Sequence, residues 1–215
     1  MTFNLTDPNY SNRNKLYDQD YESIKLKAIQ SDTLFEDEFF PPTKYSLSYT
    51  GQFDGVDIDY LNIQWLRATD LFKNAEFIKN GSSKNDVNQG QLGDCWFLCS
   101  VAVMAEREQL FKKVVPEGQG KNYCGAFLFR FWRWGNWIDV VVDDFIPVFE
   151  GRPLFTYSDD KGEFWPLLLE KAYAKLHGSY FHLVGGFSVA SLENLTGGIT
   201  ERFVGYWGPL YPLED

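Results

Sequence analysis

One cysteine stands where a glycine-flanked turn meets the start of an apolar helix. The stretch reads Gln89-Gly90-Gln91-Leu92-Gly93-Asp94-Cys95-Trp96. A helix start offers unpaired backbone N–H groups and the positive end of the helix dipole, and both favour an anionic sulfur. The position of Cys95 therefore predicts a thiolate that can act as a nucleophile.

Gln89, six residues before Cys95, supplies a second element of the same chemistry. Its side-chain amide can donate a hydrogen bond, beside the Cys95 backbone N–H, to a carbonyl oxygen that becomes negative during attack. We interpret the two residues as a nucleophile and its oxyanion donor. The alternative is that Cys95 is a small apolar packing residue, and that is the role we predict for Cys99 and Cys124.

Further motifs follow Cys95 along the chain and decide between these alternatives. They are Gly135-Asn136-Trp137-Ile138-Asp139-Val140-Val141-Val142-Asp143-Asp144, Glu163-Phe164-Trp165-Pro166-Leu167-Leu168-Leu169-Glu170-Lys171-Ala172-Tyr173-Ala174-Lys175, Gly178-Ser179-Tyr180 and Thr196-Gly197-Gly198. In this order and spacing, together with the cysteine motif, they resemble the calpains, calcium-dependent cysteine proteases with a papain-like core. The resemblance runs from roughly Thr33 to Arg202 and favours catalysis by Cys95.

A cysteine protease also needs a base, usually a histidine, to take the thiol proton and later to protonate the leaving amine. The chain has His177, at the end of a predicted helix, and His182, in an aromatic connector. Neither matches the catalytic histidine of calpains, which the resemblance places, with the catalytic asparagine, in a second lobe beyond Asp215. We therefore expect a fragment or short form that is inactive alone.

The resemblance also implies a calcium site in the first lobe. The matching positions are Lys79 and Gly81, which would offer carbonyl oxygens, and Asp86 and Glu163, which would offer carboxylates. Calcium prefers such oxygen ligands. The alternatives are a polar loop residue at Asp86 and a first-turn helix glutamate at Glu163. Calpains commonly have arginine where this chain has Lys84, and lysine cannot form the same two-point pairing with an acidic residue.

Composition limits the class of protein. Hydrophobic residues make up 44% of the 215 residues and aromatic residues 18%, which indicates a globular fold. A net charge of −10 argues against nucleic acid as a partner. Three scattered cysteines favour a reducing compartment, and the sequence shows neither a secretory signal nor a membrane span. We expect a cytoplasmic protein whose partners are protein substrates and the missing second lobe.

Apolar periodicity predicts the main elements. A loose helical period covers residues 16–29, and a helix begins at Cys95 and ends near Arg107. Residues 125–134 and 137–142 flank Gly135-Asn136 and predict a β-hairpin. A helix spans residues 163–177, with Pro166 in its first turn and Gly178 at its end.

These elements predict an α+β fold, the papain-like first lobe of a calpain core, with a central buried helix and a small antiparallel sheet. The predicted domains are a leader over residues 1–31, lobe I over 32–185 and the start of lobe II over 186–215. The predicted function is that of a calcium-dependent intracellular cysteine endopeptidase. The alternative is a non-catalytic, calcium-responsive module that binds partner proteins.

Overall fold

The computed structural model describes residues 14–53, 56–57 and 61–202. Its strands are β1 Asn14–Lys15, β2 Gln52–Phe53, β3 Val56–Asp57, β4 Gln64–Arg67, β5 Ala126–Arg133, β6 Asn136–Asp143, β7 Phe145–Phe149 and β8 Arg152–Pro153. Its α-helices are α1 Tyr21–Ser31, α2 Lys44–Leu47, α3 Ala68–Leu71, α4 Cys95–Ala105, α5 Glu108–Val114, α6 Trp165–His177 and α7 Ser188–Thr196. The predicted α+β class is confirmed, and no helix among these residues is long and apolar enough to cross a bilayer.

The predicted hairpin is the longest paired element of the sheets. Strands β5 and β6 are antiparallel from Ala126 opposite Asp143 to Arg133 opposite Asn136. Trp134 and Gly135 form the turn, both with positive φ, and such turns match the twist of the two strands. The short strand β1 adds to β6 in the parallel direction, and a separate sheet has the order β4-β7-β8.

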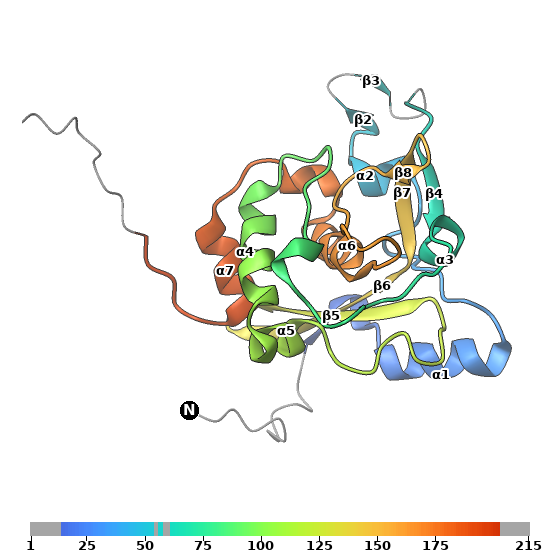
Figure 1. Cartoon of the computed structure of the whole chain (residues 1–215), viewed down its shortest axis with the longest axis horizontal. Coiled ribbons are helices and arrows are strands. Elements are labelled where there is room, and N and C mark those ends of the chain that lie inside the picture. The colour runs from blue at the N-terminus through green and yellow to red at the C-terminus, as the bar shows by residue number, and fades with distance from the viewer. Residues whose placement is uncertain (1–13, 54–55, 58–60, 203–215) are drawn as a thin grey trace, which may run out of the picture.

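Helix α6 lies at the centre of the molecule, between α4 and α7 on one side and β4 and β7 on the other (Figure 1). Every residue from Trp165 to Lys175 is buried. Pro166 occupies its first turn, where a missing N–H has no consequence, and Gly178 ends it with a φ of 101°. The predicted helix is confirmed, although it begins at Trp165 and not at residue 163, and its buried position makes it the frame on which neighbouring segments are placed.

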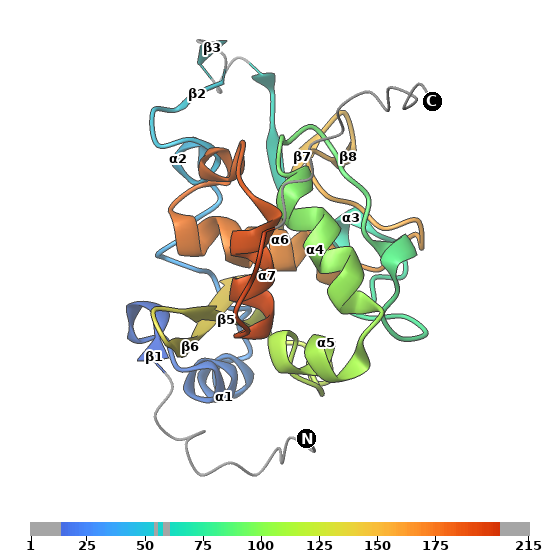
Figure 2. The ribbon, with the colours of Figure 1, turned by 90° about the vertical axis from the view of Figure 1, so that its left-hand side faces the viewer.

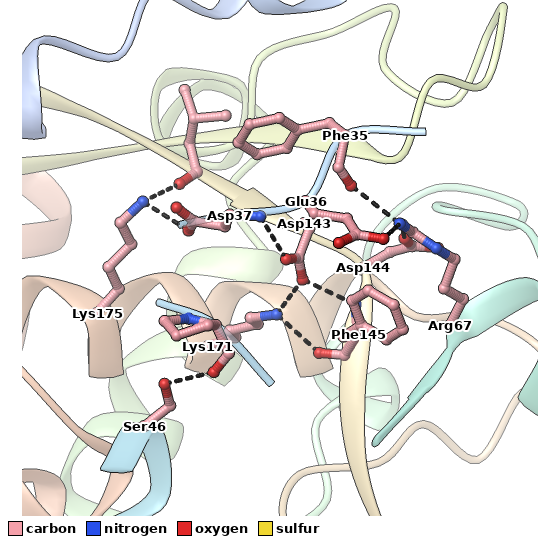
Figure 3. A network of polar contacts seen from close by, with 12 residues as sticks. Phe35, Glu36, Asp37, Ser46, Arg67, Asp143, Asp144, Phe145, Lys171 and Lys175 are labelled. Carbon is pink, nitrogen blue, oxygen red and sulfur yellow. Dashed lines mark hydrogen bonds and ion pairs between the residues drawn. The ribbon is translucent and has the colours of Figure 1, made fainter. Parts of the chain in front are cut away.

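A buried polar network joins α6 to β6 and to the segment 35–37 (Figure 3). Lys175 Nζ lies 2.6 Å from Asp37 Oδ2 and 2.7 Å from the Val141 carbonyl oxygen. Lys171 pairs with Asp143, which also accepts the Asp37 backbone N–H. Because a buried charge without a partner is strongly destabilising, these pairs fix the register of α6 against the sheet.

Residues 14–31 dock onto the sheet. Asp20 caps α1 by accepting the Ser23 N–H at 2.9 Å, and Ala28 packs in a small apolar cluster with Cys124, Ala126, Leu128 and Val141. Residues 16–18 form a short 3-10 helix, so the α-helix begins later than the period of residues 16–29 predicts. The domain boundaries at 31/32 and 185/186 stay predictions. Residues 1–13 of the first predicted domain and residues 203–215 of the last lie outside the described residues.

Helix α4 confirms the predicted start at Cys95 but ends at Ala105. Cys99 was predicted to be packed, and this prediction is wrong, because Cys99 is exposed and its sulfur lies 3.3 Å from Ser188 Oγ. Val103, one turn further, is 60% exposed, so α4 keeps one apolar face open. Cys124 is buried, as predicted. Helix α7 packs against α4 (Figure 2) and buries Leu195 in the main core.

Candidate active site

The first turn of α4 presents Cys95 at the surface. The Asp94 carbonyl oxygen accepts the backbone N–H groups of Phe97 at 2.8 Å and Leu98 at 3.1 Å, so the helix begins directly at the cysteine. The thiol is exposed, whereas Asp94 before it and Phe97 after it are fully buried. The chain therefore holds the backbone of this turn in the core and leaves the sulfur accessible to a reagent or substrate.

The loop that leads into α4 is tied to residues 154–157. Asn88 and Tyr157 exchange two backbone hydrogen bonds of 3.0 Å, and the Gln91 N–H donates to the Leu154 carbonyl oxygen at 3.0 Å. Between these bonds, a Cβ on Gly90 would lie 2.0 Å from the Phe155 carbonyl oxygen, so only glycine fits there. The close approach explains the glycine in the motif.

The other side of the turn is held by the segment that follows α6. The Gly185 N–H donates to the Gly93 carbonyl oxygen at 3.0 Å, and Trp96 Nε1 donates to the Leu183 carbonyl oxygen at 2.8 Å. A Cβ on Gly186 would meet the Trp96 ring at 2.4 Å. The residues around the Gly185-Gly186 pair thus form one wall of the Cys95 turn.

Gln89 lies within the same turn and is exposed. Its Nε2 donates to the Leu92 carbonyl oxygen at 2.6 Å. An amide nitrogen carries two hydrogens, so this bond orients the side chain and leaves a second donor. The oxyanion role of Gln89 stays a prediction.

Both histidines have structural partners. His177 Nδ1 lies 2.8 Å from the Tyr173 carbonyl oxygen, its Nε2 lies 3.2 Å from Arg133, and burial lowers its pKa. His182 stacks on the Tyr49 ring with centroids 5.2 Å apart, and its Nδ1 lies 3.2 Å from Ser179 Oγ. These contacts give each histidine a role in packing and do not direct either ring to Cys95.

The predicted calcium ligands meet in part. Glu163 is 1% exposed, and its carboxylate accepts the Lys79 N–H at 2.7 Å and the Ser158 hydroxyl at 3.1 Å. Asp86 ends a short 3-10 helix, Lys84–Asp86, and accepts the Ser83 N–H at 2.6 Å. Gly81, with a φ of 91°, has open space around its Cα. The two ends of the loop 79–86 therefore lie near Glu163.

The electrostatics of this loop suit a cation. Burial, together with the nearby negative charge of Asp86, raises the pKa of Glu163 to about 7. Lys79 Nζ does not relieve this repulsion, because it binds Asp160 at 2.9 Å and the Lys161 carbonyl oxygen at 2.7 Å. Among the described residues no three His, Cys, Asp or Glu side chains gather as a metal site. A cation here would thus depend on carbonyl oxygens as well as on the two carboxylates.

Sequence reasoning missed a pair of buried acids beside the nucleophile turn. Asp94 is 0% exposed and Glu170 of α6 is 2% exposed, and the two carboxyls interact directly. The only signal in the sequence is that Asp94 directly precedes Cys95. Nothing in the spacing of the two acids indicates that they meet.

Comparisons with known proteins agree with these motifs. A family model described as "Calpain family cysteine protease" matches residues 35–206. The human "Calpain-1 catalytic subunit" is 44% identical over 196 residues, which cover 90% of this chain and 27% of the relative. "Calpain-A" of Drosophila melanogaster is 44% identical over 187 residues, which cover 86% of this chain and 22% of the relative. The chain thus spans about a quarter of the length of these relatives.

Proposed function

This chain belongs to the calpain family of cysteine proteases, and we propose that it forms the first lobe of a calcium-dependent cysteine endopeptidase. The observation that carries the proposal is the exposed Cys95 thiol at the first residue of α4, in a turn whose backbone is fixed on both sides. Cys95 would be the nucleophile and Gln89 its oxyanion donor.

In the proposed reaction the Cys95 sulfur attacks the carbonyl carbon of a peptide bond. The electron pair of the C=O bond moves to oxygen, where the Gln89 amide and the Cys95 N–H would stabilise the negative charge. The carbonyl then re-forms, the C–N bond breaks, and the departing amine needs a proton from a general acid. The contacts of His177 and His182 hold both rings in packing roles, so we propose that this acid lies in a second lobe.

The Asp86 and Glu163 carboxylates, with the carbonyl oxygens of Lys79 and Gly81, would hold the calcium ion. The fit rests on a buried carboxyl whose pKa is raised to about 7 beside a second acid. When bound, the ion would neutralise this repulsion and hold the loop 79–86 against the first turn of α6. Because the chain belongs to the calpain family, we also propose that its substrates are proteins and that it acts inside the cell.

The experiment that tests this function mixes the chain with a separately produced second lobe of a related calpain and follows cleavage of a fluorogenic peptide. We expect cleavage only when both lobes and calcium are present. Cys95→Ser should abolish it, whereas Cys99→Ser, the matched change one helical turn away, should retain it. Stable association of the lobes without cleavage would instead support the alternative, a calcium-responsive interaction module.

A further inference from the structure

Asp94 is a buried acid whose side chain lacks a hydrogen-bond donor among the described residues. It precedes Cys95 at the start of α4, is 0% exposed, and neither of its side-chain oxygens accepts a hydrogen bond from a donor in the described part of the chain. A buried carboxylate without a donor or a cation is among the most costly groups in a protein. The carboxyl must therefore be protonated or share a proton.

Glu170 supplies the partner. It projects from α6, where its carboxylate accepts the Thr156 N–H at 3.1 Å and the Thr156 hydroxyl at 2.6 Å. The first turn of α4 packs on this part of α6, where the rings of Phe97 and Tyr173 stack with centroids 4.0 Å apart, and the side chains of Asp94 and Glu170 interact there. Among the described residues, the titratable side chain of Tyr180, which is 1% exposed, also faces the pair. The next residue, Lys171, is no counterion for Glu170, because it binds Asp143 and the Phe145 carbonyl oxygen.

Two acids in this setting keep one proton between them. Burial raises the pKa of both carboxyls, and a negative charge on either one opposes ionisation of the other. Like charges in contact cannot both ionise at ordinary pH, so the two groups titrate as one unit.

The contacts of Thr156 indicate where the negative charge stays. A backbone N–H can only donate, so Glu170 receives a donor that favours its ionised form. Asp94 has no such donor. When it is protonated, its carboxyl can form a hydrogen bond by donating its O–H to Glu170. This arrangement leaves the charge on α6 and a neutral carboxyl at the start of α4.

We propose that Asp94 and Glu170 share one proton and hold the negative charge on Glu170, so that the positive end of the α4 dipole acts on the Cys95 sulfur without a competing anion beside it. The two acids are positioning residues, since they act through the turn and through Cys95. This inference rests on the proposed function only in taking Cys95 as the reactive thiol.

The shared proton has a direct spectroscopic test. At pH 8, where Glu163 is mostly ionised, the infrared spectrum of the chain should contain the C=O band of a protonated carboxyl. Asp94→Asn and Glu170→Gln should each remove this band, and Glu163→Gln should leave it in place. A spectrum of the unmodified chain without the band would overturn the proposal, whatever the outcome of the peptidase experiment.

The position of the charge is tested by the rate of Cys95 alkylation by iodoacetamide at pH 7. Asp94→Asn mimics the neutral carboxyl, so its rate should stay within about twofold of the unmodified chain. Glu170→Gln forces the charge onto Asp94 and should slow the reaction roughly fivefold, since a neighbouring anion disfavours the thiolate while the remaining thiolate is somewhat more nucleophilic.

Glu193→Gln is the matched control, because it removes a negative charge from an exposed position of α7 and should leave the rate unchanged. Near-ultraviolet circular dichroism of each variant verifies that the fold is retained. Equal rates in Glu170→Gln and the unmodified chain, or a slow Asp94→Asn, would overturn the assignment of the charge to Glu170.

Discussion

The backbone N–H of Lys79 donates to Glu163 Oε1 across 2.7 Å, which joins the loop before the nucleophile turn to the residues that begin α6. The nearby negative charge of Asp86 raises the pKa of the same carboxyl. One buried acid thus links the predicted calcium loop to the central helix, and the behaviour of Glu163 toward cations and protons can be measured.

Calcium should stabilise the chain more than magnesium does. Binding to the native state alone contributes about 2.7 kcal/mol at a hundredfold excess over Kd, which raises the melting temperature by several degrees in a domain of this size. Magnesium demands a small octahedral shell that a loop of carbonyls and carboxylates provides poorly. Thermal melts with each ion would measure the difference.

The matched control for calcium is the double variant Asp86→Asn and Glu163→Gln, which keeps size and removes charge. Its melting temperature should not respond to calcium. An undiminished response, or an equal response of the unmodified chain to both ions, would point to general neutralisation of an acidic protein.

The pKa of Glu163 also predicts how stability changes with pH. In the unfolded chain its pKa is near the ordinary value of 4.5, and in the folded chain it is raised to about 7. The folded state therefore holds a proton that the unfolded state has released, so stability falls as pH rises from about 4.5 to about 7 and then levels off.

Urea unfolding of the unmodified chain and of Glu163→Gln at pH 5 and pH 8, without calcium, would measure this effect. The loss between the two pH values should be smaller in the variant by about 2 kcal/mol. An equal loss in both proteins would show that Glu163 does not titrate in this window.

Gly90→Ala should destabilise the chain by at least about 2 kcal/mol, because the new Cβ would lie 2.0 Å from the Phe155 carbonyl oxygen. Gly93→Ala is the matched control in the same loop, since its Cβ would meet Val184 at an ordinary 3.5 Å. Chemical unfolding of both variants checks this. Equal stability of Gly90→Ala and Gly93→Ala would mean that the loop can move to accommodate a Cβ at residue 90.

Local sequence patterns predicted the elements that depend on local chemistry. The hairpin β5–β6 follows from alternating residues around a turn, and α6 follows from Pro166 and Gly178 at its two ends. The start of α4 follows from the turn before Cys95. In each case the deciding signal lies within a few residues of the element.

Contacts between distant segments could not be predicted in this way. The exposure of Cys99 depends on what packs against α4, and the pairing of Lys175 with Asp37 depends on how α6 lies against the segment 35–37. The Asp94 and Glu170 pair forms only when the start of α4 meets α6. Such contacts are set by the tertiary fold, and the periodicity of the sequence does not predict them.

The central claim is that Cys95 is the reactive thiol of this lobe, and a peptide map after brief iodoacetamide treatment of the native chain tests it most directly. Cys99 is an internal comparison because it is also exposed, and Cys124 should react last because it is buried. We predict that Cys95 is modified first, since only Cys95 lies at the positive end of a helix. Modification of Cys99 ahead of Cys95 would contradict the account.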